Sequence, residues 1–224
     1  MYTQKNHRQR VKDRFRAEGL DNFNELHALE LLLFYAIPQK DTKQLARDLL
    51  NRFETFHGVL EATPEELETV PGVGENVATY LNLVLAAGRY YDVSRTSNVT
   101  ILQDPVKYSK YIVSCFKGRR NETVYLFCLD SKCKLLCRKL LGEGDMISAN
   151  LPIRRVVEIA LSVGAAAVLL AHNHPDGLAI PSREDIAVTL QLRQALQTVG
   201  IALTDHLVVA DGECVSMAQS GYLR

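Results

Sequence analysis

The sequence predicts an α+β protein in which a small all-α N-terminal domain is followed by a domain with a mixed β-sheet. Up to residue 91, apolar residues recur every three or four positions, without the alternation that marks a strand. Beyond residue 105, short apolar runs alternate with amphipathic stretches in the order α-β-β-α-β-α-β-β. A chain of 224 residues is long enough for each of two domains to bury its own core.

The helical domain is expected over residues 1–91. Its apolar spacing is clearest over residues 26–33, 45–50 and 81–85. Several short helices are expected, because prolines and glycines interrupt the pattern at Pro38, Gly58, Pro64 and Pro71-Gly72. Residues 92–104 are polar or β-branched and lack a period, so this segment is predicted to be a linker.

The second domain is expected over residues 105–224. Its predicted helices cover residues 106–117, 153–163 and 182–199. Its predicted strands cover residues 123–130, 133–141, 165–171, 204–210 and 214–217. Ser131-Lys132 and Asp211-Gly212 are the expected turns of two hairpins, and together these elements predict a mixed sheet flanked by helices.

Composition narrows the class of protein. The formal net charge is zero, which excludes attraction of the whole chain to nucleic acid or an anionic membrane. Residues 1–20 nevertheless carry six basic and two acidic side chains, an excess that fits a solvated helix face or a phosphate contact. The charged N-terminus, the absence of a long apolar run and five cysteines without a C-x-x-C pair predict a cytoplasmic protein with reduced thiols and no membrane partner.

The segment AHNHPDGLAIPSREDI, residues 171–186, carries the strongest chemical signal. His172 and His174 stand two apart at a strand end and can direct both imidazoles to one point. Asp185, in the first turn of the next helix, can supply a third ligand and leave a fourth zinc position open. Singly, these residues also fit a hydrogen-bonded core histidine and a helix capping box, Ser182-x-x-Asp185.

Taken together, H-x-H, seven residues, Ser, two residues and Asp resemble the signature of the JAMM (JAB/MPN) metallopeptidases. The resemblance implies a JAB/MPN-like fold, a Zn²⁺ cofactor held by His172, His174 and Asp185, and a glutamate that acts as general base and acid. Ser182 would then stabilise the oxyanion or orient its neighbours. The catalytic glutamate would be Glu122, with Glu143 as the alternative.

A wider resemblance covers both domains. HNHPDG, PSREDI, RRVVEIALSVGAAAVLL and LTDHLVVAD resemble the RadC family (UPF0758 type), which is named for DNA repair. His206 in the last of these is expected to support or pack against the metal site without ligating it. In the first domain, ELETVPGVGENVATYL fits a helix-hairpin-helix, whose turn Gly72-Val73-Gly74 can present amides to a DNA phosphate or serve only as a packing turn.

Three functions remain open at this point. The first is a zinc-dependent peptidase or isopeptidase with a peptide or isopeptide substrate. The second is a DNA-binding repair accessory protein with a vestigial zinc site, and the third is a structural zinc or regulatory module. A nuclease ranks lower, because one carboxylate and two histidines suit a single zinc better than a pair of metals. The substrate and the oligomeric state are not written in the sequence.

Overall fold

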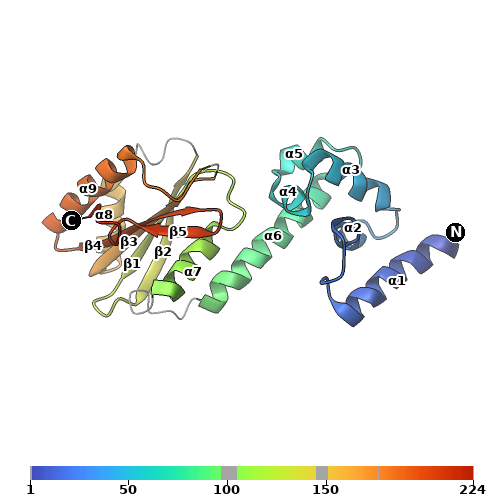
Figure 1. The fold of residues 1–224 in the computed structure, drawn as a ribbon, viewed down its shortest axis with the longest axis horizontal. Coiled ribbons are helices and arrows are strands. Elements are labelled where there is room, and N and C mark those ends of the chain that lie inside the picture. Colours follow the sequence, from blue (N-terminus) through green and yellow to red (C-terminus); the bar gives the residue numbers. More distant parts are fainter. Residues whose placement is uncertain (1, 97–104, 145–150, 176, 224) are drawn as a thin grey trace. The chain divides into compact units, whose positions relative to one another are not determined.

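The computed structural model describes residues 2–96, 105–144, 151–175 and 177–223. The chain divides into two compact units, Met1–Gly88 and Arg89–Arg224. The first contains only helices in its described part, and the second contains a five-stranded sheet with helices (Figure 1). The predicted α+β class is therefore confirmed. Within the described ranges, no helix is both long enough and apolar enough to cross a membrane.

Short capped helices make up the first unit. Asn24, Thr55 and Thr63 cap three of them by accepting a hydrogen bond from the first turn. Leu29 and Leu81 are among the fully buried leucines of its core. The helices are α1 (Tyr2–Glu18), α2 (Glu25–Ala36), α3 (Lys43–Phe53), α4 (Phe56–Glu61), α5 (Pro64–Glu68) and α6 (Glu75–Thr96), whose residues from Arg89 onward belong to the second unit.

The predicted linker, residues 92–104, begins too early. Helix α6 continues to Thr96, so its last five residues fall in the segment that the sequence pattern assigned to the linker. Val93 packs against the core of the second unit, and Asp92 forms an ion pair with Lys117 at 2.8 Å. These contacts come from residues distant in sequence, which local periodicity cannot register. The remainder of the predicted linker lies outside the described residues.

A mixed sheet of order β2-β1-β3-β4-β5 forms the centre of the second unit. Strand β3 pairs in parallel with β4, and the other neighbours are antiparallel. All five predicted strands are present: β1 (Thr123–Leu129), β2 (Leu135–Glu143), β3 (Ala167–Asn173), β4 (Ala202–Ala210) and β5 (Glu213–Ser216). The three predicted helices are α7 (Pro105–Phe116), α8 (Ile153–Ser162) and α9 (Arg183–Thr198).

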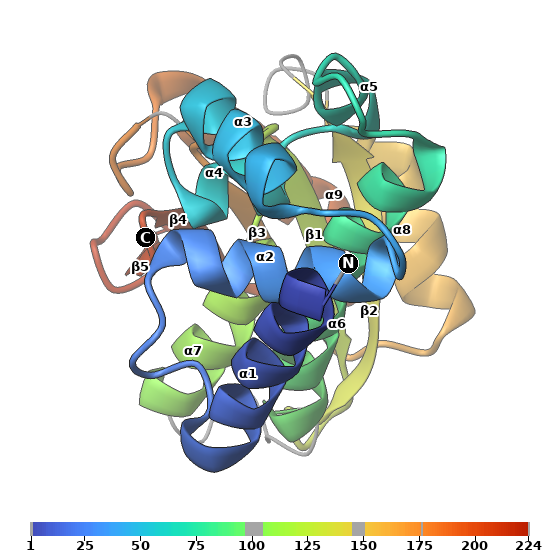
Figure 2. The same ribbon diagram turned by 90° about the vertical axis from the view of Figure 1, so that its right-hand side faces the viewer.

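Helices cover both faces of this sheet (Figure 1). Phe127 and Leu169 point to the face covered by α7, whereas Leu126 and Leu170 point to the face covered by α8 and α9. Figure 2 turns the same ribbon by 90°. Because side chains alternate along a strand, His172 shares the face of Leu170 and lies beneath α8 and α9.

Several strand boundaries differ from the prediction by one or two residues, and two of them bear on the turn after β1 and on the histidines. Strand β2 begins at Leu135, because the Asp130 side chain accepts hydrogen bonds from the amides of Lys132 and Lys134, both at 2.8 Å, and holds a longer turn than the predicted one. Cys133 has a φ of 61° in this turn and cannot belong to the strand. Strand β3 ends at Asn173, two residues later than predicted, so His172 is a sheet residue.

Candidate metal centre

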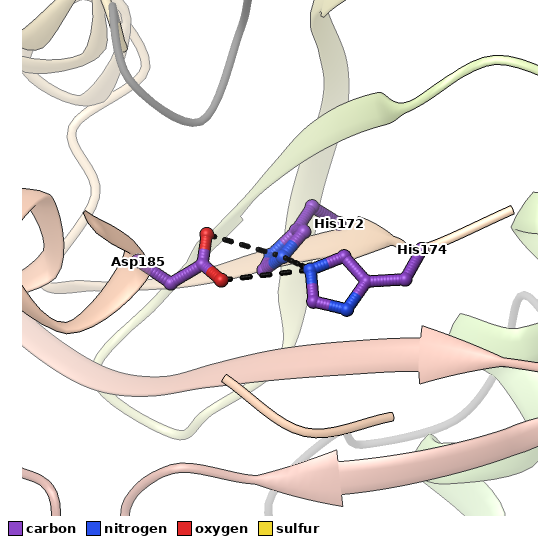
Figure 3. Close-up of side chains that lie close together, drawn as sticks. All are labelled: His172, His174 and Asp185. Atoms are coloured by element: carbon purple, nitrogen blue, oxygen red, sulfur yellow. Dashed lines mark hydrogen bonds and ion pairs between the residues drawn. The ribbon is translucent and has the colours of Figure 1, made fainter. Parts of the chain in front are cut away.

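Strand β3 carries two histidines to its C-terminal end. His172 is held between Val124 of β1 and Val208 of β4, and the amide of His174 donates to the Val209 carbonyl at 2.8 Å. Both imidazoles therefore leave the same face of the sheet and meet with their Nε2 atoms 2.9 Å apart (Figure 3). The two side chains converge because the backbone from His172 to His174 is extended, so side chains two residues apart point the same way.

Asp185 enters the same space from the first turn of α9. Its Oδ1 lies 3.3 Å from His172 Nε2, and its Oδ2 lies 3.5 Å from His174 Nε2 (Figure 3). Oδ2 also accepts hydrogen bonds from the Ser182 amide at 2.8 Å and the Ser182 hydroxyl at 2.7 Å, while that hydroxyl oxygen accepts from the Asp185 amide. The two interpretations of this carboxylate, helix cap and ligand, are thus geometrically compatible.

The three side chains fit a small divalent cation. Two ligand atoms of a tetrahedral zinc lie about 3.3 Å apart, close to the separations of 2.9, 3.3 and 3.5 Å found here. His174 Nδ1 donates to the Leu178 carbonyl at 2.9 Å, which leaves a lone pair on Nε2. Among the described residues, Asp185 Oδ1 is buried without a hydrogen-bond partner. Buried electron-pair donors that converge in this way favour a cation between them, and His172, His174 and Asp185 form a candidate metal-binding group.

The three side chains of the candidate metal centre differ in exposure to solvent, and one of them is a carboxylate. The side chains of His172 and Asp185 are 1% exposed, whereas that of His174 is 23% exposed, so solvent reaches the group past His174. Burial opposes ionisation of Asp185, but the nearby His172 imidazole and the donors of Ser182 outweigh it and hold the pKa of Asp185 below its ordinary value. The carboxylate is therefore ionised at neutral pH.

A second set of contacts lies behind His172. Its Nδ1 is 2.8 Å from Nε2 of His206, whose Nδ1 is 2.6 Å from the Thr189 hydroxyl. Burial, together with the charge of His172, lowers the pKa of His206 well below its usual value. His206 contacts a candidate ligand without joining the group. Thr189 was not singled out from the sequence, because a threonine on a helix gives no signal of such a role.

Glu122 and Glu143 differ in their surroundings. Glu122 directly precedes β1, two residues before Val124, which pairs with His172, so it lies at the end of the sheet that carries the two histidines. Its Oε1 is buried without a hydrogen-bond partner among the described residues. Glu143 pairs with Thr123, so it belongs to the sheet face opposite His172, where its carboxylate binds Arg119 at 2.7 Å.

Asn173, between the two histidines, points away from them and holds the start of β1. Its Oδ1 accepts from the Thr123 amide at 2.8 Å, and its Nδ2 donates to the Asn121 carbonyl at 3.2 Å. These bonds fix the backbone on both sides of Glu122. Asn173 is buried, and asparagine is uncommon in strands. An asparagine directly after an apolar run is the one sequence signal that could have drawn attention to it.

The hairpin of the first unit joins α5 to α6. Gly72 has a φ of +97°, which a residue with a side chain rarely adopts, and the Val73 side chain is buried in the helical core. Gly74 differs from both. A Cβ at Gly74 would meet no atom of the described residues within 4 Å, and no positive φ requires glycine there.

The fold and this group define a class, the α+β domains of JAB/MPN type with a candidate metal centre. The comparisons with known proteins agree. Residues 102–222 match the RadC-like JAB domain, and residues 55–79 match the helix-hairpin-helix motif. This chain belongs to the RadC family.

The relatives resemble the chain over nearly its full length. A UPF0758 protein of Rhodobacter capsulatus is 36% identical over 213 residues, which cover 95% of this chain and 100% of the relative. A UPF0758 protein of Ruegeria pomeroyi is 34% identical over 98% of this chain and 98% of its own length. A UPF0758 protein of Fusobacterium nucleatum is 30% identical over 97% of this chain and 97% of its own length. Their names state a family without an activity.

Proposed function

We propose that the chain is a zinc-dependent hydrolase that cleaves a peptide or isopeptide bond. The observation that carries the proposal is the convergence of His172, His174 and Asp185 on one point that is open to solvent beside His174. Two imidazoles and a carboxylate suit zinc, and three protein ligands leave a fourth position for the reaction. When bound there, zinc would supply the Lewis acidity that polarises a carbonyl and makes water nucleophilic near neutral pH.

Glu122 is proposed as the general base and acid. It directly precedes β1 at the end of the sheet that carries the ligands, and one of its oxygens is buried without a partner among the described residues and so can accept a proton. The proton taken from water would then pass to the leaving amine. Glu143 is the weaker candidate, since it is paired with Arg119 on the opposite face.

Ser182 is proposed as a positioning residue. Its hydroxyl proton is committed to Asp185 Oδ2 at 2.7 Å, which favours orientation of the carboxylate over donation to an oxyanion. The same hydroxyl could serve an oxyanion only after that bond breaks. Of the two roles that the family resemblance implies for Ser182, we therefore propose orientation.

Metal content and cleavage test this function in order. Elemental mass spectrometry is expected to find about one zinc per chain in the wild type and none in His172→Ala or Asp185→Asn. A library of internally quenched peptides, together with lysine ε-amino isopeptides, is then incubated with the zinc-loaded protein and with Glu122→Gln. Glu122→Gln should keep its zinc and lose cleavage, whereas Glu143→Gln, the matched control, should keep both.

Several results would contradict the proposal. A folded wild type that takes up no zinc would remove its basis, and cleavage that survives Glu122→Gln would remove the assigned base. If the histidine variants lost only thermal stability and the loaded wild type cleaved no amide substrate, the zinc would be structural.

A second function, binding of DNA through the hairpin, is favoured by Gly74. Residues 55–79 match the helix-hairpin-helix motif, which supports this function, and because no described neighbour fills the space beside Gly74, another molecule could approach the backbone there. The α6 N-terminus that follows can present amides to a phosphate, although the exposed Glu75 opposes this electrostatically. The contact would be independent of base sequence.

A pair of glycine variants separates this function from a packing role. Gly74→Ala should weaken binding of fluorescent duplex or branched DNA at low salt, while Gly88→Ala, the same change within α6 in equally open space, should not. Fluorescence anisotropy measures both. No binding by the wild type at low salt, or equal binding by the two variants, would contradict the proposal.

A further inference from the structure

Three buried hydrogen-bond contacts link one candidate ligand to the backbone of another. His172 Nδ1 lies 2.8 Å from His206 Nε2, and His206 Nδ1 lies 2.6 Å from Thr189 Oγ1. Thr189 Oγ1 in turn lies 2.5 Å from the carbonyl oxygen of Asp185. His172, His206 and Thr189 are at most 2% exposed, so the chain of contacts is closed to bulk water.

The position of each proton follows from the end of this chain. A carbonyl oxygen only accepts, so the Thr189 hydroxyl must donate its single proton to Asp185. The hydroxyl oxygen then accepts from His206, which places the His206 proton on Nδ1. A neutral imidazole with its proton on Nδ1 accepts at Nε2, so His172 Nδ1 donates to His206.

The alternative assignments leave a contact without a proton. If Thr189 donated to His206, two oxygen lone pairs would face each other across 2.5 Å between Thr189 and the Asp185 carbonyl. The thioether of Met217, 3.9 Å from Thr189 Oγ1, is a weaker acceptor that would also draw the hydroxyl proton away from His206. His206 is 2% exposed, and burial disfavours an imidazolium with protons on both nitrogens, so only one arrangement of neutral side chains satisfies all three contacts.

We propose that Thr189 and His206 are positioning residues that form a hydrogen-bond relay and fix the tautomer of His172, so that its Nε2 offers a lone pair to the metal. The inference rests on the metal site proposed above. His174 reaches the same state more directly, because its Nδ1 donates to the Leu178 carbonyl. The relay also begins on the backbone of Asp185, so the first turn of α9 controls both its own carboxylate and the imidazole of His172.

Removing the hydroxyl should reverse the relay. In Thr189→Val, His206 Nδ1 loses its acceptor, and the His206 proton is free to move to Nε2 and donate to His172 Nδ1. His172 would then carry its proton on Nε2, the atom that faces Asp185 and His174. Thr189→Ser is the matched control, because it keeps the hydroxyl and loses only a methyl group.

The test has two readouts. Long-range ¹H–¹⁵N correlation spectra of the metal-free protein at about pH 8, above the ordinary pKa of histidine, report the His172 tautomer directly. Competition with a chromogenic chelator gives zinc affinity. We expect Nδ1–H in the wild type and in Thr189→Ser, an increased Nε2–H population in Thr189→Val, and a loss of zinc affinity in Thr189→Val of about 10- to 100-fold.

Two results would overturn the relay. One is a wild type whose metal-free His172 carries its proton on Nε2, a measurement that needs no variant to fold. The other is a folded Thr189→Val with an unchanged tautomer and unchanged zinc affinity. In His206→Gln the side-chain amide oxygen can accept from His172, so this variant should retain Nδ1–H, and loss of that tautomer would also count against the relay. Absence of zinc binding by a wild type with the expected tautomer would instead refute the metal site alone.

Discussion

Replacing Ser182 by alanine would test how one side chain serves both a helix and a candidate metal centre. The change removes the hydroxyl bond to Asp185 Oδ2 at 2.7 Å and the cap of the Asp185 amide at 3.0 Å. The bond from the Ser182 amide to Oδ2 at 2.8 Å is unaffected. Loss of an N-cap costs about 1 kcal/mol, and the lost bond to an ionised carboxylate adds to this, so about 1–2 kcal/mol of unfolding free energy should disappear.

Calorimetry of the metal-free protein measures this cost. A loss of about 1–2 kcal/mol should lower the melting temperature of the second unit by roughly 3–8 °C. Chelator competition measures the other role, since a carboxylate that has lost one of its orienting bonds should bind zinc about tenfold more weakly. Ser182→Thr is the control, because it keeps the hydroxyl and is itself a good N-cap, so both quantities should stay near the wild-type values.

Two results would contradict the proposed role of Ser182. If Ser182→Ala changed neither melting nor zinc affinity, the hydroxyl would not position Asp185. If both stayed at wild-type values while cleavage alone was lost, Ser182 would act on the substrate, which is the oxyanion role that the geometry disfavours.

Three further outcomes are expected. Leu170→Ala, in the buried strand before the histidines, should cost about 2–5 kcal/mol in denaturant unfolding, and a cost below about 1 would contradict the assigned packing. Asn173→Ala should cost about 1–3 kcal/mol, because it leaves the Thr123 amide buried and unpaired, and Asn173→Asp should recover part of this loss. Burial raises the pKa of both Cys128 and Cys214 to about 12, so about one thiol in ten thousand is ionised at pH 8. Mass spectrometry should find both unalkylated by iodoacetamide until the protein unfolds, and rapid labelling of the folded chain would be inconsistent with this.

Much of the fold was predictable because its elements carry strong local periods. The apolar runs of β1 and β3 helped to predict the order of the elements in the second domain correctly, and the three-and-four spacing of the first domain predicted its helices. The boundaries of the elements were predicted less well. Helix α6 extends beyond residue 91, where Asp92 and Val93 contact residues of their own unit that are distant in sequence, and the turn between β1 and β2 depends on the Asp130 side chain.

The part of the candidate site whose residues are close together in the sequence could be predicted. Two histidines on one strand and an aspartate in the next helical turn are close in sequence, and the structure brings all three together. The contacts behind them are not local. His206 meets His172 because β4 lies in parallel beside β3, Thr189 reaches His206 from α9, and the face of Glu143 follows from its pairing with Thr123.

The two oxygens of the Asp185 carboxylate have different partners, because Oδ2 is bound by Ser182 whereas Oδ1 faces His172. Oδ2 is held by Ser182 through bonds that close within the first turn of α9, so the helix start is capped by the chain itself. The cores on both sides of the sheet are built from buried apolar side chains. Unlike a zinc finger, which collapses when its ion is withdrawn, this fold should survive chelation and accept metal again in the test tube, so metal-free protein can be purified and reconstituted with a series of divalent ions.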